Sequence, residues 1–121
     1  MIDISEVVGI HRILMDQFGG SSGIRDWSAL ESALQRPFQA FDNRDLYPSD
    51  FEKAAAVTES LLRNHPFIDG NKRVGYTVLR LFLASKRIEL TASKEEKYEF
   101  IVNVATGLMS FEEIVKWIEI N

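Results

Sequence analysis

Nine consecutive residues, HPFIDGNKR at positions 65–73, place a histidine, a carboxylate, a glycine turn and two cations together. His65 is a candidate general base, because a histidine side chain exchanges a proton near neutral pH and can take one from an attacking hydroxyl. Asp69 offers hard oxygen ligands, which suit Mg²⁺ together with phosphate oxygens and water. The stretch therefore has the parts that phosphoryl or nucleotidyl transfer requires.

The turn from Gly70 to Arg73 stands where an apolar helical stripe begins with Val74. The first amides of a helix have no partner within the helix and lie at the positive end of its dipole, so they can hold an anion. Glycine lets a phosphate approach the backbone. Lys72 and Arg73 add full charges, and arginine can hold a phosphate with two parallel hydrogen bonds. Gly70, Asn71, Lys72 and Arg73 are therefore our candidates for binding nucleotide phosphates.

Each of these residues also has an ordinary structural explanation. Asp69 is as well suited to capping the following helix as to binding a metal, since aspartate often occupies a cap. Phe67, between Pro66 and Ile68, is expected to anchor the loop in the core. An isolated histidine is more often structural than catalytic. The combination of His, Asp, Gly, Asn, Lys and Arg in one short loop nevertheless exceeds what capping requires, and it favours an active site.

Helix signals recur along the chain and predict the elements that must position this loop. Four Ser-x-x-Glu pairs stand where apolar stripes begin, and in such a pair the two side chains cap the free amides of a first turn. These pairs are Ser28 with Glu31, Ser49 with Glu52, Ser93 with Glu96, and Ser110 with Glu113. One further signal is Pro66, which disfavours helical geometry at His65 and should end a helix at Asn64. We expect six helices in all.

Apolar residues at helical spacing mark the faces that these helices should bury. The predicted faces are Val7, Ile10, Leu14 and Phe18; Ala54, Val57 and Leu61; Val74, Val78, Leu81 and Phe82; Tyr98, Ile101, Val102 and Ala105; and Phe111, Ile114, Val115 and Ile118. Gly19 and Gly20 should end the first of these helices, and Gly107 the fourth.

The segment FQAFDNRDLY, from Phe38 to Tyr47, does not follow the helical pattern. It lies between Pro37 and Pro48, with aromatic residues near both ends and Asp-Asn-Arg-Asp between them. This composition suits a small hairpin or an extended flap, and a structureless loop is equally allowed.

The composition indicates one domain spanning residues 1–121, since 45% of the 121 residues are apolar and an independent core is expected. The chain has no cysteine, which excludes disulfides and thiolate metal sites and fits a cytoplasmic protein. We find no signal peptide, and no apolar run approaches the roughly 20 residues that a bilayer span requires. No membrane association is expected.

The net charge of −4 conceals one basic segment. From Leu61 to Arg87 there are six cations and one acid, so the segment carries +5 and the remainder −9. This distribution argues against a general nucleic-acid binder, but it is compatible with one phosphate-bearing ligand in the basic segment. For Arg80, Lys86 and Arg87 we favour a solvated helix face.

HPFIDGNKR resembles the signature of the Fic/Doc superfamily, and its lysine makes it similar to the Doc (death-on-curing) branch, the toxins of toxin–antitoxin systems. The resemblance runs from about His11 to Leu90 and rests on stretches that match in order. These are His11, Gly19-Gly20 through Gly23-Ile24-Arg25-Asp26, Leu30-Glu31-Ser32-Ala33-Leu34 followed by Pro37, Leu46-Tyr47-Pro48, Glu52-Lys53-Ala54-Ala55, and Asn64-His65-Pro66-Phe67.

The resemblance implies an all-α fold, a compact bundle of about six helices with a short flap or β-hairpin before the central helices. It implies that His65 is the general base, that Asp69 binds Mg²⁺, and that the turn from Gly70 to Arg73 binds the phosphates of ATP. Arg63 would assist with phosphate. A flap would align a target peptide by strand-like pairing; its residues are Phe41, Asp42, Asn43, Arg44, Asp45 and Leu46.

Two positions depart from the AMP-transferring Fic pattern Gly-Asn-Gly-Arg with a second arginine three residues later. Lys72 replaces the second glycine, and Tyr76 stands where the later arginine would be. In Doc-like proteins such a change accompanies an inverted ATP whose γ-phosphate faces the target hydroxyl. The resemblance therefore implies phosphorylation of a translation factor such as elongation factor Tu. AMP transfer to a protein hydroxyl is the alternative, and an inactive module that binds a peptide or partner is another.

The self-inhibiting helix of the family has no intact copy in this sequence. Its pattern is Ser or Thr, three residues, then Glu and Gly or Asn, and the nearest approach is Thr91 with Glu95 followed by Glu96. Restraint is then expected from a cognate antitoxin supplied in trans, whose disordered segment folds onto the toxin.

Overall fold

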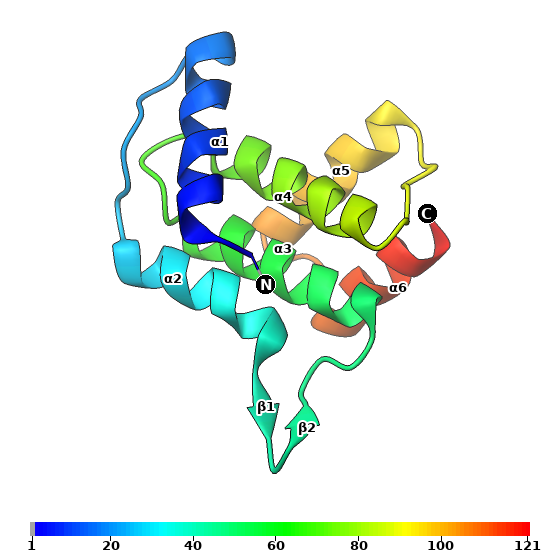
Figure 1. Cartoon of the computed structure of the whole chain (residues 1–121). Helices are drawn as coiled ribbons and strands as arrows, with labels where there is room; N and C mark the ends of the chain where they lie inside the picture. The colour runs from blue at the N-terminus through cyan, green and yellow to red at the C-terminus, as the bar shows by residue number, and fades with distance from the viewer. Residues whose placement is uncertain (1) are drawn as a thin grey trace.

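The computed structural model describes residues 2–121 and contains six α-helices, one short 3₁₀ turn and one two-stranded hairpin (Figure 1). The predicted all-α fold with a hairpin before the central helices is confirmed. The elements are α1 (Ile4–Phe18), α2 (Trp27–Gln35), η1 (Arg36–Phe38), β1 (Ala40–Phe41), β2 (Arg44–Asp45), α3 (Asp50–Asn64), α4 (Asn71–Ser85), α5 (Lys94–Ala105) and α6 (Phe111–Ile120).

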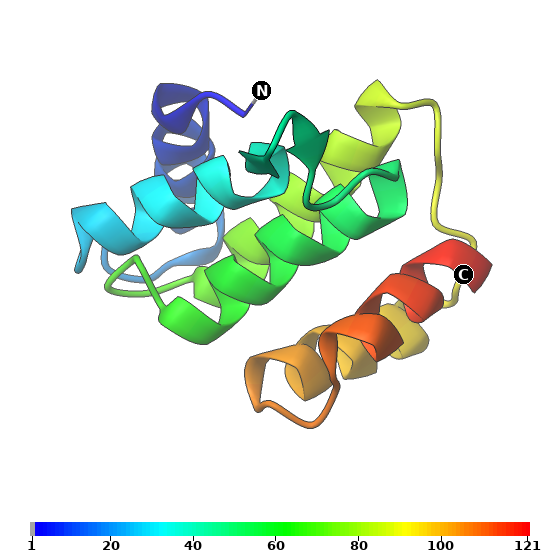
Figure 2. The ribbon, with the colours of Figure 1, turned by 90° about the horizontal axis from the view of Figure 1, so that it is seen from below.

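Helix α3 is the centre of the bundle. It contacts α2, α4, α5 and α6, and Figure 2 shows α1 and α2 on one side of the α3–α4 pair and α5 and α6 on the other. All residues from Ala54 to Leu62 are buried, so this part of α3 has no solvent face. Gly75 of α4 permits the close crossing with α3, because a Cβ there would lie 2.7 Å from a methyl carbon of Leu62. The core therefore fixes both helices that flank residues 65–70.

Three of the four predicted serine–glutamate capping boxes are present, at Ser49, Ser93 and Ser110. The fourth prediction, Ser28 with Glu31, is wrong. Asp26 caps α2 instead, accepting a hydrogen bond from the amide of Ala29 at 3.0 Å, and Ser28 lies inside the first turn. Aspartate and serine are about equally good caps, so the pair pattern alone did not locate this helix start.

The apolar face predicted to be buried is correct for α3. In the faces predicted for the other helices, three residues are exposed instead of buried. Phe18, Leu81 and Tyr98 are 58%, 46% and 70% exposed. In α1 the buried line is Val7, His11 and Met15, with a polar residue at its centre. The prediction of buried faces missed His11 because it considered only apolar side chains at helical spacing.

The segment from Phe38 to Tyr47 contains the predicted hairpin. Ala40 pairs with Asp45 and Phe41 with Arg44 in antiparallel register. Asp42 and Asn43 form the turn, both with positive φ (53° and 61°), as tight hairpin turns require.

Arg36 and Lys53 attach the hairpin to the bundle. Arg36 donates to the Tyr47 hydroxyl at 2.9 Å and to Glu59 at 2.8 Å, while Lys53 donates to Asp45 at 3.2 Å. Burial lowers the pKa of Arg36, but the hydrogen bonds to Tyr47 and Glu59 outweigh it and hold this pKa above its ordinary value. The guanidinium therefore stays charged at the base of the hairpin.

No helix within residues 2–121 has the length and apolar character needed to cross a bilayer.

Candidate active site

The predicted catalytic stretch forms the connection between α3 and α4. Helix α3 ends at Asn64, and His65 follows in the left-handed conformation, with φ 48° and ψ 60°. This conformation is uncommon for residues other than glycine. The helix thus ends where Pro66 predicted, and the His65 side chain is exposed, where a substrate can reach it.

The segment between α1 and α2 pairs with the first half of this loop. Ile24 and Phe67 form an isolated antiparallel bridge. The Pro66 carbonyl accepts hydrogen bonds from the amides of Arg25 and Asp26, at 2.8 and 3.0 Å. The loop is therefore anchored by backbone pairing to a segment about 40 residues earlier in the chain.

Arg25 also contacts this loop with its side chain. Its Nε–H donates to the His65 carbonyl at 2.7 Å, and its Nη2 donates to the Asn64 carbonyl at 2.6 Å. The last carbonyls of a helix lack partners within the helix and lie at the negative end of its dipole, so a cation is favourable here. Arg25 belonged to the matching stretches of the sequence, but its contact with His65 was not predicted.

Phe67 anchors the loop in the core, as expected, and is 1% exposed. The ring of His11 stacks on it at a centroid distance of 3.9 Å and an interplanar angle of 10°. His11 Nε2 lies 2.7 Å from the Asp69 carbonyl oxygen. A carbonyl oxygen only accepts, so Nε2 must carry the proton. A buried histidine of α1 thus supports both the anchor and the candidate metal ligand.

Asn71 closes the loop with its side chain. Its Oδ1 accepts from the Phe67 amide at 3.0 Å, and its Nδ2 donates to the Phe67 carbonyl at 3.0 Å. Both polar ends of the Asn71 side chain are thereby engaged within the loop. Its remaining contribution to anion binding is its backbone amide in the first turn of α4.

The Asp69 carboxylate lies against two backbone amides. Oδ1 accepts from Gly70 at 2.8 Å, and Oδ2 accepts from Ser21 at 3.3 Å. Gly20 allows this approach, because a Cβ at that position would lie 2.9 Å from Oδ2. Asp69 therefore accepts from the residue just before α4 and from no amide within that helix, while each oxygen keeps a lone pair that could face a cation.

Residues 2–121 contain no group of three or more His, Cys, Asp or Glu side chains that could hold a metal ion by themselves. A magnesium ion that is bound through one or two carboxylates, with phosphate oxygens and water as its other ligands, needs no such group. The exposed Asp69 carboxylate at the start of α4 fits that role.

Within the described residues, α4 is the one α-helix whose start has no side-chain cap. Its N-cap, Gly70, has φ 74° and lies so close to Met15 that a Cβ would be 2.2 Å from the methionine Cε. Lys72 and Arg73 in the first turn are exposed. The Arg73 guanidinium carbon lies 4.7 Å from the ring centroid of the exposed Phe18, a cation–π contact.

The Arg63 side chain forms its hydrogen bonds and its ion pair outside this loop. Its guanidinium forms an ion pair with Glu59 at 2.7 Å, donates to the Val104 carbonyl at 3.1 Å and donates to the Met109 carbonyl. The two carbonyl partners lie in α5 and the connection after it, so the Arg63 guanidinium points toward those elements. In this structure Arg63 joins α3 to α5 and to the connection after it, and its assistance with phosphate stays a prediction.

The hairpin and the catalytic loop lie at opposite ends of α3 (Figures 1 and 2). The 15 residues of this helix span about 22 Å. No hydrogen bond within residues 2–121 joins residues 41–46 to residues 65–73. The structure therefore confirms the hairpin but does not bring it into contact with His65.

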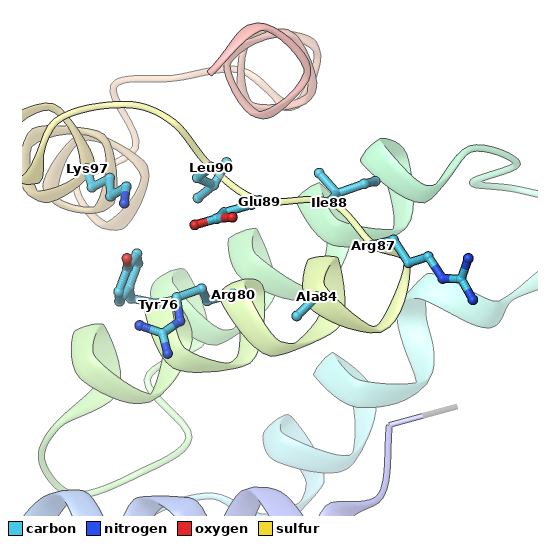
Figure 3. A pocket seen from close by; sticks show the side chains of 8 residues that line it. All are labelled: Tyr76, Arg80, Ala84, Arg87, Ile88, Glu89, Leu90 and Lys97. Atoms are coloured by element: carbon cyan, nitrogen blue, oxygen red, sulfur yellow. The ribbon is translucent and has the colours of Figure 1, made fainter.

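A cavity of about 600 Å³ also lies apart from the loop, between α4, the connection after it and α5 (Figure 3). Tyr76, Arg80, Glu89 and Lys97 face it, whereas Arg87 extends away. Two cations and a carboxylate of opposite charge surround an open space, and no residue of HPFIDGNKR lines it. The chemistry of the loop, not the size of this cavity, identifies the candidate site.

Comparison with known proteins agrees with this assignment. A model of the Fic/DOC family matches residues 1–83, which include the whole loop. The chain is also similar to the protein named Toxin Doc of Mycolicibacterium smegmatis (strain ATCC 700084 / mc(2)155), with 38% identity over 93 residues that cover 77% of this chain and 67% of that protein. The matching loop, its helical setting and these two similarities lead to one conclusion: the chain belongs to the Fic/DOC family.

Proposed function

We propose that this protein is a Doc-type toxin that transfers the γ-phosphoryl group of ATP to a hydroxyl of a protein. The observation that carries the proposal is the geometry of one loop. It combines an exposed His65, an exposed carboxylate at Asp69 and a helix start with no side-chain cap, followed by Lys72 and Arg73. The similarity to a protein named as a toxin supports the same reading.

In this proposal the start of α4 holds the nucleotide phosphates. The free amides of its first turn and the charges of Lys72 and Arg73 offset the charge of the transferred group. His65 takes the proton of the target hydroxyl as that oxygen bonds to the γ-phosphorus, and the bond from this phosphorus to the β-phosphate oxygen breaks to release ADP. Asp69 would hold Mg²⁺, which neutralises phosphate charge when it is bound.

Lys72 is the reason to favour phosphoryl transfer over AMP transfer. An exposed lysine occupies the position of the second glycine in the AMP-transferring pattern, and the half-buried Tyr76 offers no cation where that pattern has an arginine. The phosphates should therefore be held in another orientation. AMP transfer remains the competing activity, and the assay below separates the two.

We further propose a translation factor, with elongation factor Tu as the first to test, as the target in the cytoplasm. A cognate antitoxin supplied in trans would restrain the toxin. The hairpin would pair with an extended segment of the target. Because the hairpin is about one helix length from His65, that segment would need roughly seven extended residues to reach the base.

The test is a transfer assay with ATP labelled at either the α- or the γ-phosphate, Mg²⁺ and purified elongation factor Tu. Label should reach the factor from γ-labelled ATP and not from α-labelled ATP. His65→Ala should abolish transfer and growth arrest, while Arg80→Ala, which changes an exposed arginine elsewhere on α4, should retain both. Label from α-labelled ATP would show AMP transfer. Growth arrest that survives His65→Ala would refute base catalysis at this loop.

A further inference from the structure

His65 has a left-handed backbone conformation, which is unfavourable for residues other than glycine. It is a non-glycine residue with φ 48° and ψ 60°, and it lies between the end of α3 and Pro66. Such a conformation persists only where the surroundings determine it. The contacts that hold the His65 backbone in this conformation therefore also set the direction of its imidazole side chain.

The Arg25 side chain holds the backbone at His65 by hydrogen bonds. The exposed His65 side chain has no hydrogen-bond partner within residues 2–121. Its carbonyl and that of Asn64 accept from Nε and Nη2 of Arg25, at 2.7 and 2.6 Å. Two donors of one planar guanidinium thus hold two consecutive carbonyls. These carbonyls belong to the two peptide planes on either side of the His65 Cα, so their relative orientation constrains φ and ψ of His65.

We propose that Arg25 is a positioning residue for the base, holding His65 in its left-handed conformation so that the imidazole is presented toward the start of α4. The proposal rests on the proposed function and adds a residue from outside the catalytic loop to it. Arg25 does not touch the reacting atoms; it acts through the His65 backbone.

Arginine is specifically suited to this task. A guanidinium presents its donors in a fixed plane, so it can hold two carbonyls at a set angle, whereas a lysine ammonium is a point charge on a flexible stem. Arg25 also starts from a fixed position, because its own amide donates to Pro66 at 2.8 Å. The exposed side chain contributes nothing to the core, so its removal should leave the fold intact.

Kinetics with Arg25→Ala and Arg25→Lys test the proposal, with Arg80→Ala as the matched control on an exposed arginine. Because a misplacement of about 1 Å can cost roughly a hundredfold in rate, kcat of Arg25→Ala should fall about 10- to 100-fold. KM for ATP should stay within about twofold, since the phosphate-binding turn is untouched. Arg25→Lys should restore little, and free guanidinium should partly restore Arg25→Ala but not alter Arg80→Ala.

A spectroscopic measurement keeps this proposal separate from the proposed function. The three-bond coupling between the His65 amide and α protons, with the Cα and Cβ shifts, reports whether φ of His65 is positive. We expect a left-handed His65 in the wild type and in Arg80→Ala, and averaging toward other conformations in Arg25→Ala. If the wild type transfers no label at all, the proposed function fails, and this measurement still decides the role of Arg25. An unchanged His65 backbone in Arg25→Ala, or a kcat equal to that of Arg80→Ala, overturns it.

Discussion

Replacing Gly70 by alanine should destabilise the protein through two separate effects. The residue has φ 74°, a conformation that costs an L-residue about 1–2 kcal/mol. An added Cβ would also lie 2.2 Å from Cε of Met15, a side chain that is 4% exposed and must move within the core. Overpacking of this kind costs about 1–3 kcal/mol. The free energy of unfolding should therefore fall by about 2–5 kcal/mol.

Three other glycines separate these two effects. Gly9 in α1 has an ordinary φ and nothing within 4 Å of an added Cβ, so alanine there should stabilise the protein by about 0.5–1 kcal/mol. Gly107 has φ 80° and also nothing within 4 Å, so alanine should incur only the backbone cost of about 1–2 kcal/mol. Gly75 has an ordinary φ but would meet Leu62 at 2.7 Å, so it isolates the steric cost.

Urea unfolding of the four alanine variants measures these differences, with the slope m checked for constancy. The double variant Gly70→Ala with Met15→Ala adds a direct test. Removing the methionine tip should cancel part of the Gly70→Ala cost, giving a favourable coupling of about 1–3 kcal/mol. If Gly70→Ala loses no more than Gly107→Ala, and the coupling is zero, the close packing of α1 under the phosphate-binding turn is wrong.

Three more changes test the supports of the site and the helix starts. Asn71→Ala removes both hydrogen bonds to Phe67 and should cost about 1–3 kcal/mol of unfolding free energy in urea, because two backbone groups lose their partners; a loss equal to that of an exposed-site variant would contradict this. Glu59→Ala leaves two arginines without their shared carboxylate and should cost about 3 kcal/mol by thermal unfolding, whereas Asp50→Ala, which breaks an exposed ion pair at 4.0 Å, should cost less than about 1 kcal/mol. Hydrogen bonds from the backbone and side chain of Ser110 hold the pKa of Glu113 below its ordinary value, so its stabilising effect is present above about pH 4.5 and is lost as the pH falls through the lowered pKa. Glu113→Gln should therefore reduce the loss of stability between neutral and acidic pH, and an identical pH profile would show that this capping box does not contribute.

Much of the fold could be predicted from local signals because they act within one turn of helix. The boxes at Ser49, Ser93 and Ser110 involve residues three apart, and Pro66 acts on its immediate neighbour. The same logic failed at Ser28, where Asp26 two residues earlier is an equally good cap. A local pattern identifies that a helix begins, but it does not decide between two adequate caps.

The supports of the site could not be predicted because they come from distant parts of the chain. His11 meets Asp69, and Arg25 meets His65, across 58 and 40 residues of sequence. Spacing along the chain says nothing about such contacts. Arg63 shows the converse: it is close to His65 in sequence, but its guanidinium contacts the carbonyls of Val104 and Met109.

The residues of the catalytic stretch have two roles: some would contact the substrate, and others hold the loop in its conformation. Residues that would meet a substrate, namely His65, Asp69, Lys72 and Arg73, are exposed. Others hold the loop itself: Phe67 fills the core, and Asn71 closes onto its backbone.

Gly70 contributes to both roles, since it permits the turn that would bind phosphate and leaves room for Met15 beneath it. A loop that presented only the reactive groups would have no fixed shape, and a base or an anion site is effective only when it is held in place before the substrate arrives. The residues that form no contact with substrate are therefore as necessary to this stretch as those that do. The variants Gly70→Ala and Arg25→Ala test whether these supporting contacts are needed, the first near the start of α4 and the second at the end of α3.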